Sequence, residues 1–278
     1  MSECSGTCSS CGDGGCSRRQ EPMKEQLNEY SSVKKTIAVV SGKGGVGKSL
    51  VTSLLAVAMR NEGFNTGIID ADITGPSIPK AFGVTELTGT YEERLMPGVS
   101  QKGTQIVSIN LLMEHDTDPV VWRSPIITGT VKQFWSEVIW DCVDYMFVDM
   151  PPGTGDVPLT VFQSLPLDGI VIVASPQDLV GMIVEKAVKM AEMFQIPILA
   201  FVENMSYFEC PNCNTKHRIF GKSHIHELAE RYKVDTVCEI PMDANIAASV
   251  DRGDVESIDP VWMSDLVRKL KSMTEETS

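Results

Sequence analysis

The residues best suited to chemistry form one glycine-rich stretch, made up of Ser41, Gly42, Lys43, Gly44, Gly45, Val46, Gly47, Lys48 and Ser49. Glycines let backbone N–H groups turn toward an anion without a clash from Cβ, and a following helix N-terminus favours the same anion. In such a loop Lys48 would reach the β and γ phosphates of a nucleotide, while the Ser49 hydroxyl would bind Mg²⁺. The spacing therefore predicts a phosphate-binding P-loop. The alternative is a glycine-rich turn that contains Gly-Lys-Ser by chance.

Lys43 is a second cation in this loop, which ordinarily needs only Lys48. We expect Lys43 to point out of its own site and to reach the phosphates of a facing subunit, as an arginine finger does. At this point the sequence resembles the deviant Walker A class, which contains the MinD, ParA and nitrogenase iron protein ATPases. The resemblance implies that Lys43 contacts nucleotide across a dimer and is catalytic together with Lys48.

Three carboxylates follow short apolar runs. Asp70 and Asp72 end the run that begins at Thr66, and Asp149 ends the run that begins at Tyr145. Ligands of parallel α/β sheets lie beyond the carboxyl ends of the strands, so these acids should face the phosphates. We expect Asp72 to position or deprotonate the attacking water, Asp70 to support Mg²⁺ or its water shell, and Asp149 to bind Mg²⁺ through water. A helix cap is the alternative for one of the first two.

The residues after Asp149 join stiff prolines to permissive glycines over positions 150–156. Such a loop can hold two positions that depend on a γ-phosphate, so we interpret it as a nucleotide-sensing switch. Asn204 follows another apolar run and is placed to hydrogen-bond a base edge, as is the turn that contains Pro241 and Asp243. Resemblance to the deviant Walker A class implies that these places line an adenine pocket. A surface loop is the alternative for Asp243.

The eight cysteines are clustered, and six of them form two groups, Cys4, Cys8, Cys11 and Cys16 near the N-terminus and Cys210 with Cys213 later in the chain. Four thiolates at short spacing can hold an iron–sulfur cluster or a tetrahedral zinc, or the tail can bind nothing. Cys210 and Cys213 supply only two ligands, and a third from His217 still leaves one missing. We therefore expect two such loops to meet across a dimer axis. Cys142 and Cys238 are expected to be buried as small apolar residues.

Composition excludes several function classes. The formal net charge of −13 argues against a general nucleic-acid binder. No apolar run approaches the length of a membrane span, and the N-terminus lacks the apolar core of a signal peptide. We therefore expect a cytoplasmic protein without a membrane partner. The apolar face of residues 261–273 should dock on the domain, because its flanking charges are mixed rather than basic.

The elements that position these residues follow from the apolar pattern. Buried strands are expected at residues 36–40, 66–70, 105–109, 145–149, 169–174, 198–202 and 236–240, and helices at 50–61, 125–140, 180–194 and 261–273. Continuous apolar strands are typical of a parallel sheet covered on both faces. The prediction is an α/β P-loop NTPase domain over residues 34–278, with a mainly parallel sheet and helices on both faces. A disordered, Cys-rich tail is predicted for residues 1–33.

Lys43 with Lys48, the segments 70–77 and 149–156, and Cys210-x2-Cys213 together resemble the Mrp family of iron–sulfur cluster carrier ATPases over about residues 34–270. The resemblance implies a homodimer that binds ATP with Mg²⁺ and hydrolyses it slowly. It also implies a bridging [4Fe–4S] cluster that is passed to apoproteins with the help of assembly proteins. The N-terminal cysteines resemble the tail of the eukaryotic cytosolic scaffold branch, apart from their first gap. The alternative is a ParA- or MinD-like partitioning or positioning ATPase with a structural zinc or no metal.

Overall fold

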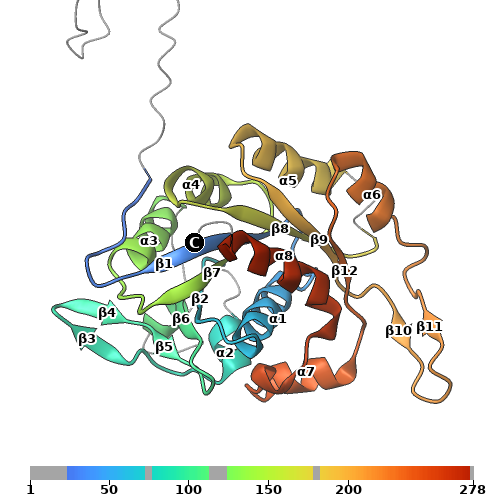
Figure 1. Ribbon diagram of the computed structural model, residues 1–278, viewed down its shortest axis with the longest axis horizontal. Helices are drawn as coiled ribbons and strands as arrows, with labels where there is room; N and C mark the ends of the chain where they lie inside the picture. The colour runs from blue at the N-terminus through green and yellow to red at the C-terminus, as the bar shows by residue number, and fades with distance from the viewer. Residues whose placement is uncertain (1–23, 73–76, 113–123, 178–181, 276–278) are drawn as a thin grey trace, which may run out of the picture.

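A central sheet of eight strands runs through the computed structural model, which describes residues 24–72, 77–112, 124–177 and 182–275 (Figure 1). The strand order is β12-β9-β8-β1-β7-β2-β6-β5, and every pairing except β5 with β6 is parallel. The strands are β1 (Val33–Ser41), β2 (Thr66–Asp70), β5 (Gly98–Val99), β6 (Gln105–Ser108), β7 (Val143–Asp149), β8 (Gly169–Ala174), β9 (Ile198–Glu203) and β12 (Val237–Glu239). The predicted mainly parallel sheet is confirmed.

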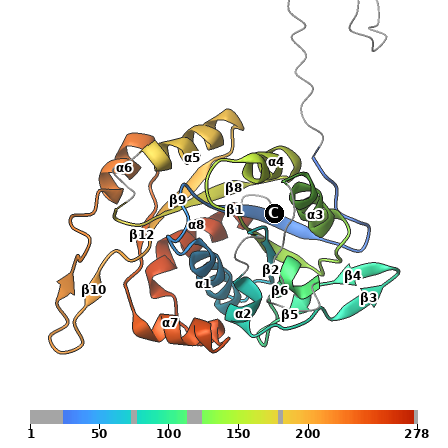
Figure 2. The same cartoon turned by 180° about the vertical axis from the view of Figure 1, so that it is seen from behind.

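Helices cover both faces of the sheet (Figures 1 and 2). One face carries α1 (Lys48–Asn61), α2 (Ile78–Phe82), α7 (Ala244–Asp251) and α8 (Ser264–Glu275), and the other carries α3 (Ser124–Ser136), α4 (Asp156–Ser164), α5 (Met182–Met193) and α6 (Ile225–Tyr232). Successive side chains of a strand point to opposite faces. In β1, Ile37 and Val39 therefore enter the core under α1, while Ala38 and Val40 enter the core under α3 to α6. This explains why the strands have no polar face.

Shorter elements lie at the edges of the domain. They are the hairpin of β3 (Gly89–Tyr91) and β4 (Arg94–Met96), the hairpin of β10 (Phe208–Glu209) and β11 (Lys216–His217), and the 3-10 turns η1 (Ile109–Leu112), η2 (Val255–Ser257) and η3 (Val261–Met263). Helix α8 docks on the domain as expected, with Leu266 and Leu270 fully buried. Among the helices described, none is both long and apolar enough to cross a lipid bilayer.

Residues 24–32 fall within the predicted tail, yet hydrogen bonds fix them to the domain. Lys24 Nζ donates to the carbonyls of Phe162 and Leu165, at 2.8 and 2.9 Å, at the end of α4. The Asn28 amide donates to the carbonyls of Ser136 and Val138 at the end of α3. A cation and amide donors satisfy the carbonyls that a helix end leaves unpaired. This part of the predicted tail therefore packs against the domain instead of being flexible.

Candidate functional site

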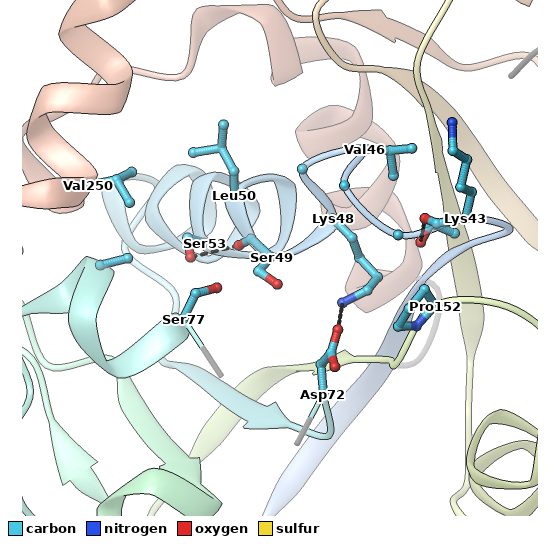
Figure 3. Close-up of a pocket in the computed structure, with 15 residues that line it drawn as sticks. Lys43, Val46, Lys48, Ser49, Leu50, Ser53, Asp72, Ser77, Pro152 and Val250 are labelled. Carbon is cyan, nitrogen blue, oxygen red and sulfur yellow. Dashed lines mark hydrogen bonds and ion pairs between the residues drawn. The ribbon is translucent and has the colours of Figure 1, made fainter. Parts of the chain in front are cut away.

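The glycine-rich loop connects the end of β1 to the start of α1, as predicted. Gly45 and Gly47 both have φ of +80°, in the left-handed region that favours glycine. A Cβ on Gly47 would also lie 2.1 Å from Asn204 Nδ2, so no larger residue fits there. The loop lines a cavity of about 330 Å³ together with residues from α2 and the loop after β7 (Figure 3). The backbone thus forms a concave cradle at the N-terminus of α1, which is suited to an anion.

Lys48 and Ser49 converge on Asp149 at the end of β7. Lys48 Nζ lies 2.8 Å from Asp149 Oδ1 and 3.5 Å from Asp72 Oδ2, and Ser49 Oγ donates to Asp149 Oδ2 at 2.6 Å. The Thr52 hydroxyl adds a hydrogen bond of 2.8 Å to Asp149 Oδ1. Lys48 and Asp149 are both buried, so this ion pair is shielded from water. The structure therefore brings together the predicted phosphate lysine, the predicted Mg²⁺ hydroxyl and two of the three predicted carboxylates.

Asp70, the third carboxylate, lies opposite Asp149 in the register of β2 and β7. It accepts hydrogen bonds from Ser108 Oγ at 3.1 Å and from the Asp72 backbone N–H at 3.2 Å. Burial, followed by the charge of Asp149, raises the pKa of Asp70 well above its usual range, although Lys48 and these hydrogen bonds oppose the shift. A buried carboxyl of this kind ionises more readily when a cation is nearby. A metal ion bound nearby would therefore favour the ionised form of Asp70.

Lys43 differs from Lys48 in direction. In Figure 3 the Lys43 side chain points away from the Lys48–Asp72 pair, whereas Lys48 enters the space above Asp72. The Lys43 carbonyl accepts a hydrogen bond of 3.0 Å from Ser41 Oγ, which fixes the backbone at this point of the loop. A role for Lys43 in the site of a facing subunit stays a prediction.

The three residues predicted to contact a base are divided between two places. Asn204 is buried, and its Nδ2 donates to the Val46 carbonyl of the P-loop at 2.9 Å. Pro241 and Asp243 instead line a second cavity, of about 480 Å³, together with Cys210. Asp243 also caps α7, because its Oδ1 accepts from the Asn245 backbone N–H at 2.7 Å. Base recognition by these residues stays a prediction.

Cys210 and Cys213 lie in the loop of a projecting hairpin, residues 208–217, which we call the thiol hairpin. The Cys210 N–H donates to the Thr215 carbonyl at 3.0 Å, which closes the loop. Cys213 is exposed, and its Sγ lies 3.2 Å from Thr215 Oγ1. Hydrogen bonds from Thr215, and next from Cys210, lower the pKa of the Cys213 thiol. The thiolate is the form of cysteine that binds metals, so these surroundings make Cys213 better suited to be a metal ligand.

The predictions for the remaining cysteines are confirmed at Cys238 and wrong at Cys142. Cys238 is buried as predicted, and burial raises its pKa to about 11. The prediction for Cys142 is wrong, because this residue is exposed in a turn with φ of +49°. Within the described ranges no three His, Cys, Asp or Glu side chains gather as a metal site, so His217 does not complete one there. Cys4, Cys8, Cys11 and Cys16 lie outside the described residues.

Comparisons with known proteins identify the family. Residues 32–276 match the family described as ParA: NUBPL iron-transfer P-loop NTPase. The chain is 40% identical to the iron-sulfur cluster carrier protein of Clostridium perfringens, over 90% of this chain and 94% of that protein. It is 39% identical to the iron-sulfur cluster carrier protein of Methanocaldococcus jannaschii, over 91% and 90%. The chain belongs to the iron–sulfur cluster carrier family of P-loop NTPases.

Solved structures of other proteins are similar to this chain. A nucleotide-binding protein from Archaeoglobus fulgidus, in complex with ADP and with cobalt found in it, superimposes with a TM-score of 0.75 at 43% identity, and covers 83% of this chain and 91% of its own. MinD from Aquifex aeolicus superimposes with a TM-score of 0.56 at 18% identity, over 87% and 97%. The MinD likeness shows a shared fold alone.

Sequence reasoning missed several residues that hold the carrier's functional groups. They are Thr52 beside Asp149, Ser108 beside Asp70, Thr215 beside Cys213, and Glu203 and Arg218 beneath the thiol hairpin. Thr52 could have been found, because it lies one helical turn after Lys48 and therefore on the same face of α1. Ser108 depends on the pairing of β6 with β2, which the sequence does not specify.

Proposed function

We propose that this chain is an ATP-dependent iron–sulfur cluster carrier of the cytoplasm. As a homodimer it would hold one [4Fe–4S] cluster between two thiol hairpins and pass it to apoproteins. The observation that carries the proposal is a pair of thiols on one hairpin, the partly buried Cys210 and the exposed Cys213, on a domain whose P-loop is fully formed. Family membership supports the same function.

The nucleotide half of the proposal rests on the donors around Lys48. The N-terminus of α1 and the cradle provide backbone N–H groups for phosphates, and Lys48 provides the charge. The Ser49 hydroxyl and the Asp149 carboxylate, 2.6 Å apart, are oxygen ligands of the kind that Mg²⁺ takes, directly or through water. ATP with Mg²⁺ therefore fits the residues present. On binding, Lys48 exchanges its carboxylate partners for phosphate oxygens.

Hydrolysis is assigned to Asp72 and Lys43. Asp72 lines the cavity, 3.5 Å from Lys48, where it can accept a proton from water or orient that water. The Lys43 side chain points away from the Lys48–Asp72 pair, so we assign it to the phosphates of the partner subunit. Base recognition by Asn204, Pro241 and Asp243 belongs to the same proposal.

The part of the proposal that concerns the thiols rests on the number of ligands that an iron–sulfur cluster needs. A [4Fe–4S] cluster takes four thiolates, and the thiol hairpin offers two. A second copy of the chain supplies the missing pair when the hairpins meet. Exposed thiols at a dimer surface suit a cargo that has to leave, since a recipient can approach them. The N-terminal cysteines are assigned to an accessory site for iron, zinc or a client.

Anaerobic reconstitution with iron and sulfide tests the proposal. In protein whose four N-terminal cysteines are replaced by serine, we expect about four iron and four sulfide per dimer, a brown chromophore, and dimers by light scattering. Cys210→Ser should abolish the chromophore, whereas Cys142→Ser, the matched exposed thiol, should retain it. A strictly monomeric protein in the presence of nucleotide and iron would overturn the proposal. Zinc bound at one per dimer without iron would favour the alternative of a positioning ATPase with a structural metal.

A further inference from the structure

A charged cluster joins the thiol hairpin to the edge of the central sheet. Arg218 follows the hairpin directly, and its guanidinium reaches both oxygens of Glu239, at 2.8 and 3.1 Å. The other side of the guanidinium lies 3.5 Å from Glu203 Oε2. Glu203 and Glu239 are paired positions at the ends of β9 and β12. One arginine therefore spans the two strands nearest the hairpin (Figure 1).

Glu203 makes this contact hard to break, because it is fully buried. The Ser206 hydroxyl donates to its Oε2, and the Ser223 hydroxyl donates to Oε1 at 2.7 Å. Arg218 is the cation that faces this carboxylate, and it also donates to Ser206 Oγ at 3.1 Å. A buried carboxylate is strongly unfavourable without a cation. The end of β9 therefore holds Arg218 in place, and with it the C-terminal strand of the hairpin.

The same end of β9 also contacts the P-loop. Asn204 is the next residue after Glu203, and its amide donates to the Val46 carbonyl at 2.9 Å. Its Nδ2 lies 2.1 Å from the position that a Cβ on Gly47 would take. The residue that follows Glu203 is therefore in direct contact with the P-loop.

A second connection runs through the turn after β12. The Ser206 N–H donates to the Ile240 carbonyl at 2.9 Å, and the Met242 N–H donates to the Tyr207 carbonyl at 2.7 Å. The residues that follow, Asp243 among them, line the cavity that also contains Cys210. The start of the thiol hairpin is thus attached to the turn assigned above to base recognition.

We propose that Arg218 is a positioning residue that couples the thiol hairpin to the P-loop through Glu203 and Asn204. Nucleotide in the P-loop then changes how accessible Cys210 and Cys213 are to iron donors and recipients. The inference rests on the proposed function, since it assigns Cys210 and Cys213 as the cargo ligands.

Alkylation of the metal-free protein tests this coupling without any cluster. The rates at Cys210 and Cys213 are followed by peptide-resolved mass spectrometry, without nucleotide and with Mg²⁺ and ADP or a non-hydrolysable ATP analogue. In the wild type we expect the rates to differ about fivefold or more between these states. In Arg218→Gln the ratio should fall to about 1, while nucleotide affinity stays at the wild-type value. The matched control is Arg231→Gln, because Arg231 also pairs with a glutamate, Glu185, at 2.9 Å but away from the hairpin.

Conservative variants keep the test decisive if Arg218→Gln fails to fold. Arg218→Lys retains the charge but not the two-sided fork, so it should retain part of the nucleotide effect. Glu239→Gln leaves the buried Glu203 pair intact and should weaken the effect without unfolding the protein. The coupling would be overturned if nucleotide left the alkylation rates of Cys210 and Cys213 unchanged in the wild type. It would also be overturned if Arg218→Gln kept the full effect of nucleotide on these rates. Absence of iron–sulfur binding by the wild type would instead overturn the proposed function, because that measurement is separate.

Discussion

Lys48 Nζ and Asp149 Oδ1 lie 2.8 Å apart, in a pair that is buried on both sides. One member belongs to the P-loop and the other to the end of β7, so the pair fixes the loop to the sheet. In the proposed function, Lys48 and Asp149 are also the groups that contact a nucleotide and its metal ion. The ion pair therefore neutralises both charges in the nucleotide-free protein, and the proposed function predicts that phosphates replace Asp149 as the partner of Lys48.

Lys48→Ala should lower the free energy of unfolding of the nucleotide-free protein by about 3 kcal/mol, because Asp149 then stays buried with hydroxyl donors alone. The same change should abolish nucleotide binding. Urea unfolding and equilibrium titration measure the two effects. Lys80→Ala is the control, since Lys80 pairs with Asp251 on the surface and should contribute little to stability. A Lys48→Ala protein as stable as the wild type would contradict the role given to this pair.

Asp70→Asn should stabilise the metal-free and nucleotide-free protein above neutral pH. Burial and the charge of Asp149 raise the pKa of Asp70, so the folded state binds a proton that the unfolded state releases. Wild-type stability therefore falls as the pH rises from the ordinary carboxyl range through the raised pKa. The asparagine carries no charge and escapes this loss, so its advantage should shrink toward acid pH.

Thermal or urea unfolding of wild type and Asp70→Asn at several pH values measures this difference. Asp149→Asn is the contrasting variant: it weakens the pair with Lys48 and should be less stable than the wild type at neutral pH. An Asp70→Asn protein less stable than the wild type at pH 8 would show that Asp70 is ionised and well paired in the fold.

The P-loop, the parallel sheet and the ends of β2 and β7 were predictable from sequence because their signals are local. Glycine spacing and uninterrupted apolar runs depend on neighbouring residues only. The predicted switch loop was less accurate at its end, because α4 already begins at Asp156. No bounds were predicted for helices α2, α4, α6 and α7, which have only five to nine residues each and leave little periodicity to detect.

Contacts that depend on tertiary structure were out of reach. The Arg218 cluster needs the register of β9 with β12, which no spacing in the sequence specifies. At Cys142 the local sequence led to a wrong prediction of burial. Trp140 and Val143 on either side are buried, so the surroundings suggested a buried thiol, but a left-handed turn directs Cys142 outward.

The thiols should differ in their reactivity with iodoacetamide near neutral pH. Cys213 should react faster than Cys142 and Cys238, because Thr215 lowers its pKa, Asp141 raises that of Cys142, and burial raises that of Cys238 to about 11. The thiolate is the reactive form. Thr215→Val removes the hydroxyl that hydrogen-bonds with Cys213 and should slow the reaction of Cys213 severalfold. The rate should fall by less than the thiolate fraction does, because a more basic thiolate is more nucleophilic. Peptide-resolved labelling checks the order, and an unchanged rate in Thr215→Val would contradict it.

Lys43→Ala should bind nucleotide but lose most of its ATPase activity, because the site of one subunit then receives no lysine from the other. A finger residue supplied by a partner accounts for about 10³-fold or more in rate in comparable NTPases. The decisive measurement mixes Lys43→Ala with Asp72→Ala, each inactive alone. In a mixed dimer the Lys43→Ala subunit keeps Asp72 and Lys48 and receives Lys43 from its partner. Random pairing should therefore restore roughly one quarter of the wild-type sites. If Lys43 served its own subunit, neither half of the mixed dimer would be complete, and the mixture would stay inactive.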